Sequence, residues 1–281
     1  MTDDPWHTER LDLDAYLTRI GVPVRPPSRA ALDELHEAHV RTFTFDNIDV
    51  LLDQHPGVSL DAVQDKFVHR GRGGYCFEHA TLFAAATQRL GYATERRLGR
   101  VGDPAASART HCVVLVTVDD EPLLADLGFG LTLLRPIALK DQATEDHGGW
   151  AYQVRRTAVG IGNGWELRRA HNEGWELMHT HDELPVHPDD LVCGHHFTST
   201  FPTSHFRHTL MVTRHTHPGE HVTVTHGAVT IRRPGQPTEH RPIDTAELAQ
   251  LLRQLDVPLA GEEEQRLLAR AAQLRATDSE S

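Results

Sequence analysis

The first third of the chain carries apolar residues at helical spacing. Four stretches show such a stripe, and each has an N-cap residue before it or a glycine after it: 13–20 before Gly21, a stretch after Ser28, a stretch after Ser59, and 76–90 before Gly91. Residues 43–52 break this period, so we expect them to be extended. The pattern predicts a small helical bundle over residues 1–91.

Beyond residue 92 apolar and polar positions alternate, which is the period of a β-strand. Seven segments show this alternation: 96–101, 110–118, 122–127, 135–139, 150–156, 164–169 and 174–179. Asp119 and Asp120 form a good tight turn between the second and third segments. We therefore expect residues 92–187 to fold as an antiparallel sheet or barrel.

The last third of the chain mixes both periods. The predicted elements are a helix from Pro188 to about 198, strands at 206–213, 221–225 and 228–232, a helix capped by Asp244, and a helix at 261–275. The six residues after 275 are expected to be frayed. Residues 188–281 are thus predicted to form a mixed α/β part that packs against the rest, because no long linker precedes it.

Composition limits what the protein can bind and where it works. The chain has 281 residues and a formal net charge of −12, which argues against nucleic acid as a partner because phosphate binding needs a basic face. No apolar run is long enough to span a membrane, and the acidic, polar first residues do not resemble a signal peptide. Three widely spaced cysteines offer no disulfide framework. We therefore expect a cytoplasmic protein, a monomer or homodimer, that binds no membrane.

Cys76 lies in the sequence RGRGGYCFEHA, residues 70–80, between a glycine run and a predicted helix. A cysteine at a helix N-terminus meets unpaired backbone N–H groups and the positive end of the dipole, and both favour the thiolate. The glycines let the backbone come close to whatever the sulfur attacks. Cys76 is therefore a candidate nucleophile, although a lone cysteine is more often a small core residue. We expect Cys112 and Cys193 to be buried and inert.

A thiol nucleophile needs a base, and the base needs a group that orients it. His111 lies in the predicted strand 110–118, and Asp126 lies near the end of the next strand. Counting outward from a turn at residues 119 and 120 pairs 113 with 126, so His111 and Asp126 share a face. This spacing predicts a triad of Cys76, His111 and Asp126. The alternative interpretation is an ordinary strand histidine and a turn carboxylate.

Four motifs, in this order, resemble those of the arylamine N-acetyltransferases. They are F-D-N-I-D at 45–49, RGRGGYCFEHA at 70–80, T-H-C-V with D-L-G-F-G between 110 and 130, and F-T-S-T-F-P-T-S-H-F at 197–206. The resemblance implies an α+β fold with a cysteine-protease-like catalytic core. Its three parts would be an N-terminal helical bundle (1–91), a central antiparallel β-barrel (92–187) and a C-terminal α/β lid (188–281).

The resemblance also implies a two-step reaction that needs no metal. Cys76 would take an acetyl group from acetyl-CoA as a thioester and pass it to the nitrogen of an arylamine or arylhydrazine, with His111 as base and acid and Asp126 orienting it. Three phenylalanines would line the acceptor site: Phe45, Phe129 and Phe206. Three further residues would contact acetyl-CoA: Thr110, Gly128 and Gly130. Because CoA is anionic and the chain is acidic, we also expect a local basic patch.

Three other interpretations stay open at this point. An amide synthase of natural-product biosynthesis would use the same triad on a carrier-bound acyl chain. A cysteine protease or transglutaminase-like hydrolase would share the order of Cys, His and Asp. A histidine-rich metal-binding protein is the third, because the 21 histidines include several close sets with a nearby carboxylate. The candidate ligands are His179, His181, Asp182, His187, His195, His196, His205 and His208.

Overall fold

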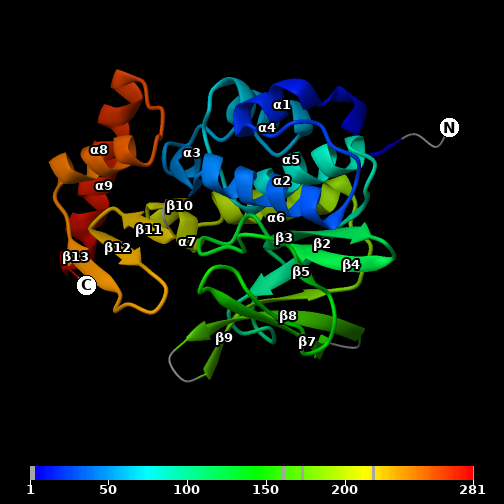
Figure 1. The fold of residues 1–281 in the computed structure, drawn as a ribbon. Coiled ribbons are helices and arrows are strands. Elements are labelled where there is room, and N and C mark those ends of the chain that lie inside the picture. Colours follow the sequence, from blue (N-terminus) through cyan, green and yellow to red (C-terminus); the bar gives the residue numbers. More distant parts are fainter. Residues whose placement is uncertain (1–3, 160–161, 172–173, 217–218, 281) are drawn as a thin grey trace.

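A computed structural model describes residues 4–159, 162–171, 174–216 and 219–280 of the chain. In Figure 1 the N-terminal helices (blue to cyan) lie above the strands of a green β-sheet, and most of the last third (yellow to red) lies to the left. The protein has the predicted α+β class. Among the described residues, no helix has the length and apolar character needed to cross a membrane.

Four of the N-terminal helices lie close to where the sequence predicts: α1 (Leu13–Ile20), α2 (Arg29–Thr42), α4 (Leu60–Gln64) and α5 (Cys76–Arg89). The short helix α3 (Ile48–Leu51), a 3-10 turn at Thr8–Arg10 and a π-helical turn at Asp65–His69 were not predicted. The hydroxyls of Ser28 and Ser59 accept hydrogen bonds from backbone N–H groups three residues on, as N-caps do. Residues 76–87 are buried without a break, so α5 is the central helix of this part.

The expectation of an extended segment at 43–52 is wrong for its second half. Strand β1 (Phe45–Asp46) is only two residues long, and α3 follows it directly. The Asp46 carboxylate accepts a hydrogen bond from Ile48 N, which favours a helical turn at this point. The Asn47 side chain donates to the carbonyls of Phe206 and Thr209, so this corner is fixed against the last third of the chain.

The middle of the chain forms an eight-stranded antiparallel sheet. Its strands are β2 (Ala93–Val101), β3 (His111–Val118), β4 (Glu121–Ala125), β5 (Ile137–Ala138), β6 (Thr144–Asp146), β7 (Ala151–Val159), β8 (Gly162–His171) and β9 (Gly174–Asp182), in the order β5-β4-β3-β2-β9-β8-β7-β6. Ala138 N on one edge strand donates to the Glu145 carboxylate on the other. The two edges thus meet, and the sheet is a nearly closed barrel. The short strand β6 was not predicted.

The register of β3 and β4 agrees with the prediction. Val114 pairs with Ala125, which is the pairing obtained by counting outward from a turn at Asp119 and Asp120. Both aspartates have positive φ, as the two central residues of a type I′ hairpin do. Asp126, the residue after β4, therefore lies near the start of β3, where His111 is.

A second antiparallel sheet lies in the last third of the chain. Its strands are β10 (Met211–Thr216), β11 (Glu220–Thr225), β12 (Ala228–Arg232) and the unpredicted β13 (Glu239–Pro242), and β1 pairs with β10 at one edge. The helices are α6 (Pro188–Thr200), α7 (His205–His208), α8 (Thr245–Gln254) and α9 (Gly261–Glu280). The first and last parts of the chain thus share a sheet, while the division at residues 91 and 187 stays a prediction.

Two expectations for the last third are wrong. The strand predicted at 206–213 begins only at Met211, because α7 occupies 205–208 and Asn47 binds the backbone at both ends of the turn after it. The C-terminal residues are helical to Glu280 instead of frayed after 275. His226 Nε2 lies 2.7 Å from the Asp278 carboxylate, a contact that fixes the end of α9 against the second sheet.

Candidate active site

Cys76 is the first residue of α5, and only 4% of it is exposed. The N–H groups at this helix end have no partner within the helix, so they and the helix dipole favour negative charge at the sulfur. The Sγ atom lies 3.6 Å from the carbonyl oxygen of Thr110. Gly128 packs behind the cysteine so closely that a Cβ atom there would be 2.4 Å from the Cys76 Cα. This close approach requires a glycine.

The turn before Cys76 is held by a buried carboxylate. Tyr75 N donates to Glu78 Oε2 at 3.0 Å, and Glu78 Oε1 accepts from Lys66 Nζ at 2.8 Å. Burial alone would raise the pKa of Glu78, but Lys66, and then His55, hold that pKa below its usual range. Glu78 therefore stays charged at neutral pH, and the start of α5 is anchored by an ion pair.

His111 and Asp126 meet beside the cysteine. His111 is the first residue of β3 and its Nε2 lies 3.2 Å from Asp126 Oδ1, with both side chains buried. This contact leaves the other ring nitrogen, Nδ1, for the thiol. Burial would lower the pKa of His111, but Asp126, and then Cys76, outweigh burial and raise this pKa to about 10. His111 is thus an imidazolium at neutral pH, and its charge holds the pKa of Asp126 far below the usual range despite burial.

A second imidazole, which the sequence analysis did not assign to this site, occupies the other oxygen of Asp126. His179 on β9 donates from Nε2 to Asp126 Oδ2 at 3.1 Å and is fully buried. Burial lowers the pKa of His179, so this ring is neutral. The H-T-H-D motif at 179–182 marks this histidine in the sequence, but on sequence alone it indicates a possible metal site.

The sulfur opens onto a cavity of about 960 Å³, which is lined by residues of α5, of the barrel and of the last third of the chain. Apart from buried Asp126, all of the predicted site residues line this cavity: Phe45, Cys76, Thr110, His111, Gly128, Phe129, Gly130 and Phe206. The Phe129 ring meets the His111 ring edge-on at 5.5 Å between centroids, and the Phe45 and Phe206 rings are 6.1 Å apart. The cavity therefore has an aromatic wall next to the candidate nucleophile.

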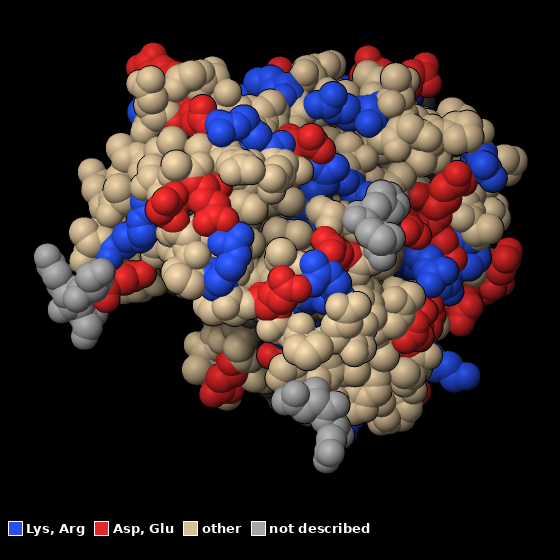
Figure 2. All heavy atoms as spheres, turned by 60° about the vertical axis from the view of Figure 1, so that its left-hand side comes forward, with Lys and Arg blue, Asp and Glu red and all other residues tan. Residues whose placement is uncertain are grey.

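The cavity wall also carries two arginines from different sheets. Arg169 on β8 donates from Nε to the Glu176 carboxylate at 2.7 Å, and Arg232 lies on β12. Burial, and then repulsion by Arg169, lower the pKa of Arg232. Glu176 is thus paired with Arg169 and acts on Arg232 only electrostatically, so an anion would relieve the repulsion between the two guanidinium groups. Figure 2 shows acidic and basic side chains interspersed on one face of the molecule.

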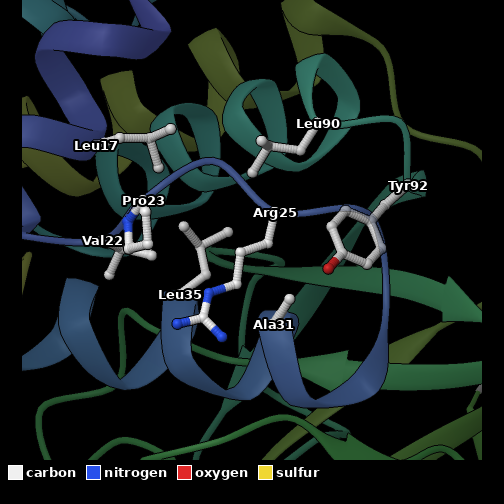
Figure 3. Close-up of a pocket in the computed structure, with 8 residues that line it drawn as sticks. All are labelled: Leu17, Val22, Pro23, Arg25, Ala31, Leu35, Leu90 and Tyr92. Atoms are coloured by element: carbon white, nitrogen blue, oxygen red, sulfur yellow. The ribbon is translucent and has the colours of Figure 1, made fainter.

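A second hollow, between α1, α2 and the end of α5, has a volume of only about 10 Å³. Figure 3 shows its apolar lining, which includes Leu17, Leu35 and Leu90, with Arg25 in the centre of the view and Tyr92 at the right. A space of this size holds about one water molecule. It is a packing defect and cannot accept a substrate.

The structure also bears on the other sequence expectations. In the described ranges the candidate metal ligands are dispersed, and the group of three potential ligand residues that does occur is His111, Asp126 and His179, with ligand atoms within 4.8 Å of one another. These three residues lie close together because both histidines contact the Asp126 carboxylate, as described above. Cys112 is buried as expected, with burial raising its thiol pKa. The expectation for Cys193 is wrong, because its side chain on α6 is exposed.

Comparisons with known proteins point to one family. A family model described as N-acetyltransferase matches residues 29–261. The chain is 36% identical to the arylamine N-acetyltransferase / N-hydroxyarylamine O-acetyltransferase of Salmonella typhimurium, over 86% of this chain and 87% of that protein. It is 33% identical to the arylamine N-acetyltransferase of Escherichia coli, over 75% of each.

Solved structures agree with these sequence matches. The arylamine N-acetyltransferase from Mycobacterium abscessus superposes with a TM-score of 0.89 at 33% identity, covering 95% of this chain and 97% of that one. The Mycobacterium marinum enzyme in complex with CoA superposes with a TM-score of 0.84 at 31% identity, covering 94% and 99%.

Proposed function

The chain belongs to the arylamine N-acetyltransferase family, and from this membership we propose that it moves an acetyl group from acetyl-CoA, by way of a thioester on Cys76, to the nitrogen of an arylamine or arylhydrazine. The observation that carries the proposal is the His111–Asp126 pair beside a helix-terminal cysteine at the wall of a large cavity. The family names of the relatives do not favour an amide synthase or a protease.

The first half-reaction starts from a Cys76 thiolate and a His111 imidazolium. The Cys76 thiolate attacks the thioester carbonyl, and the negative oxygen of the tetrahedral intermediate lies near the free N–H groups at the start of α5. The carbon–sulfur bond to CoA then breaks, and the His111 imidazolium gives its proton to the departing CoA thiolate. The products are free CoA, acetyl-Cys76 and a neutral His111.

The second half-reaction restores the starting state. The amine nitrogen attacks the acetyl-Cys76 carbonyl, and neutral His111 accepts a proton from that nitrogen. The Cys76 sulfur leaves as a thiolate while His111 is again an imidazolium. Asp126 stays ionised in both halves, so its role is to orient the ring and to stabilise the charge that forms on it.

The cavity provides chemically distinct walls for the two substrates. Phe45, Phe129 and Phe206 present aromatic faces and edges to an aromatic acceptor near the sulfur. The donor passes Thr110, Gly128 and Gly130, and Arg169 and Arg232 bind phosphate groups of CoA. A volume of about 960 Å³ suits such a donor, since it is at the upper end of the usual range for ligand cavities.

The test is intact-protein mass spectrometry after brief mixing with acetyl-CoA, with Cys76→Ala as the control. We expect the mass to rise by one acetyl group, to return to its starting value when an arylhydrazine is added, and to stay constant in the control. If acetyl-, propionyl- and malonyl-CoA all leave the mass unchanged, the CoA-dependent function is wrong. We further propose a cytoplasmic location, which keeps the thiol reduced, and a monomer or homodimer, which size-exclusion chromatography with light scattering would distinguish.

A further inference from the structure

The Asp126 carboxylate is shared by two histidines that differ in charge. His111 contacts Oδ1 at 3.2 Å and His179 contacts Oδ2 at 3.1 Å, and none of the three side chains is more than 2% exposed. An ionised carboxylate only accepts hydrogen bonds, so His179 must carry its proton on Nε2. The His179 Nδ1 atom, by contrast, is buried without a hydrogen-bond partner among the described residues.

The barrel brings the histidines together across a glycine. Gly99 on β2 pairs with His111 on one neighbouring strand and with His181 on the other. A Cβ atom at residue 99 would lie 2.5 Å from the Thr180 carbonyl oxygen, so this position requires a glycine. Strand β2 therefore places no side chain between the histidines of β3 and those of β9. As a result the His111 and His179 rings are 4.7 Å apart between centroids, and His181 lies 5.8 Å beyond His179.

We propose that His179 is a positioning residue for the reaction, a neutral imidazole that donates to Asp126 Oδ2 and holds the carboxylate in the plane from which it orients His111. His179 is not among the residues that line the cavity, so it acts through Asp126. An Asp126 with one free oxygen could rotate about χ2, a torsion with a broad range, and the His111 contact would lengthen. The inference rests on the proposed triad.

Several titratable groups surround this site, and among them the buried Cys112, His36 and Tyr152 interact electrostatically with Asp126. Cys76 and Asp126 face His111, while His111, His181 and Asp126 face His179. Arg97 acts on His181 from the neighbouring strand β2. Burial keeps His179 and His181 neutral, so Asp126 supplies the negative charge that His111 requires.

The test is the pH dependence of Cys76 alkylation by iodoacetamide in a Cys193→Ser background, which removes the exposed thiol. His179→Leu should slow alkylation at pH 7 by about tenfold or more and move the midpoint of the profile to higher pH, because a displaced His111 no longer stabilises the thiolate. His179→Gln can still donate to Asp126 and should stay within about threefold of the parent. The proposal would be overturned if the alkylation profile of His179→Leu superimposed on that of the parent. It would also be overturned if His179→Gln were alkylated as slowly as His179→Leu.

A matched control separates positioning from loss of a buried ring. His36 is equally buried, its Nδ1 lies 3.1 Å from the Leu134 carbonyl oxygen, and it acts on Asp126 electrostatically without a hydrogen bond to it among the described residues. His36→Leu should therefore reduce stability but move the alkylation profile much less than His179→Leu does. If His179→Leu does not fold, ¹⁵N-histidine NMR of the parent protein decides. The proposal requires His179 to stay neutral with its proton on Nε2 from pH 6 to 9, and titration or an Nδ1 proton would overturn it. Alkylation needs neither acetyl-CoA nor an amine, so failure of the acetyl-transfer function is a separate result.

Discussion

Gly128 and Cys76 are in direct backbone contact: a Cβ atom added to Gly128 would lie 2.4 Å from the Cys76 Cα and 3.2 Å from its backbone nitrogen. The contact joins the turn after β4, which carries Asp126, to the first residue of α5. The separation of the candidate nucleophile from its base therefore depends on a residue with no side chain.

Gly128→Ala should lower kcat/KM by about 10- to 100-fold, because it forces the turn and the helix start apart by a fraction of an ångström or more. It should also destabilise the fold by about 1–3 kcal/mol, the usual cost of overpacking. Steady-state kinetics and urea unfolding measure the two effects. Gly174→Ala is the matched control, since a Cβ at Gly174 meets no atom of the described residues within 4 Å. Equal activity in the two variants would contradict the role of the contact.

Because His111 is an imidazolium in the folded protein, the free energy of unfolding should fall as pH rises above neutral. The pKa of His111 is raised from 6.5 to about 10 in the folded protein, so the stabilisation is fully present below about pH 6.5 and is lost as pH rises toward 10. We expect His111→Gln to be less stable than the parent by a few kcal/mol at pH 6.5, with the difference disappearing near pH 10. Urea unfolding at pH 6.5, 8 and 10 checks this. A difference that is constant across the series would show that His111 is not charged in the native state.

The arginines at the cavity wall should affect the donor and not the acceptor. Arg232→Gln should raise KM for acetyl-CoA by about 5- to 20-fold with little change in kcat, because a guanidinium–phosphate contact contributes about 1–2 kcal/mol. The same variant should use an acetyl-pantetheine donor, which has no nucleotide phosphates, as well as the parent does.

Arg233→Gln is a close control for this experiment. Arg233 follows Arg232 in the chain but is paired with Glu220 and Glu239 outside the residues that line the cavity. Its KM for acetyl-CoA should match that of the parent. If Arg232→Gln raised KM by the same factor for acetyl-CoA and for acetyl-pantetheine, the substitution would act on folding or on acceptor binding and not on the phosphates of CoA.

Sequence reasoning predicted those features that depend on neighbouring segments. The pairing of β3 with β4 follows from a two-residue turn, so the approach of His111 to Asp126 could be counted from the sequence. The caps at Ser28 and Ser59 are likewise local. Even the short helix α3 was missed, because the Asp46 and Asn47 contacts that favour it involve side chains and a distant segment.

Features that join distant strands could not be predicted. His179 reaches Asp126 because β9 pairs with β2, far back in the sequence, and a register shift between Leu167 and Arg168 alters the count along the neighbouring strand β8. Arg169 and Arg232 belong to different sheets, so their proximity depends on how the two sheets pack. Alternation along the sequence predicts which side chains share one face of a strand, but it does not predict which sheets pack against each other.

A buried ion-pair network connects α9 to the turn before Cys76. Glu263 on α9 contacts Arg72 at 2.7 Å, and Arg72 contacts Asp49 at 3.0 Å. Lys66 then bridges Asp49 and Glu78 at 2.9 and 2.8 Å. Lys66 is only 1% exposed, and its ammonium is shared by two buried carboxylates, of which Asp49 also contacts Arg72.

Lys66→Met should destabilise the protein by about 3–5 kcal/mol at pH 7.5, since it leaves buried Glu78 without its ammonium partner and Asp49 with Arg72 as its remaining cation. The loss should shrink toward pH 5. Lys66 holds the pKa of Asp49 and of Glu78 low against burial, and without it both values rise, so the carboxylates can protonate and lose their charge. Urea unfolding at the two pH values measures this, with exposed Lys140→Met as the control that should be near neutral at both. If Lys66→Met lowered the free energy of unfolding by the same amount at pH 5 and pH 7.5, the cause would be poor packing of the methionine and not the loss of the positive charge.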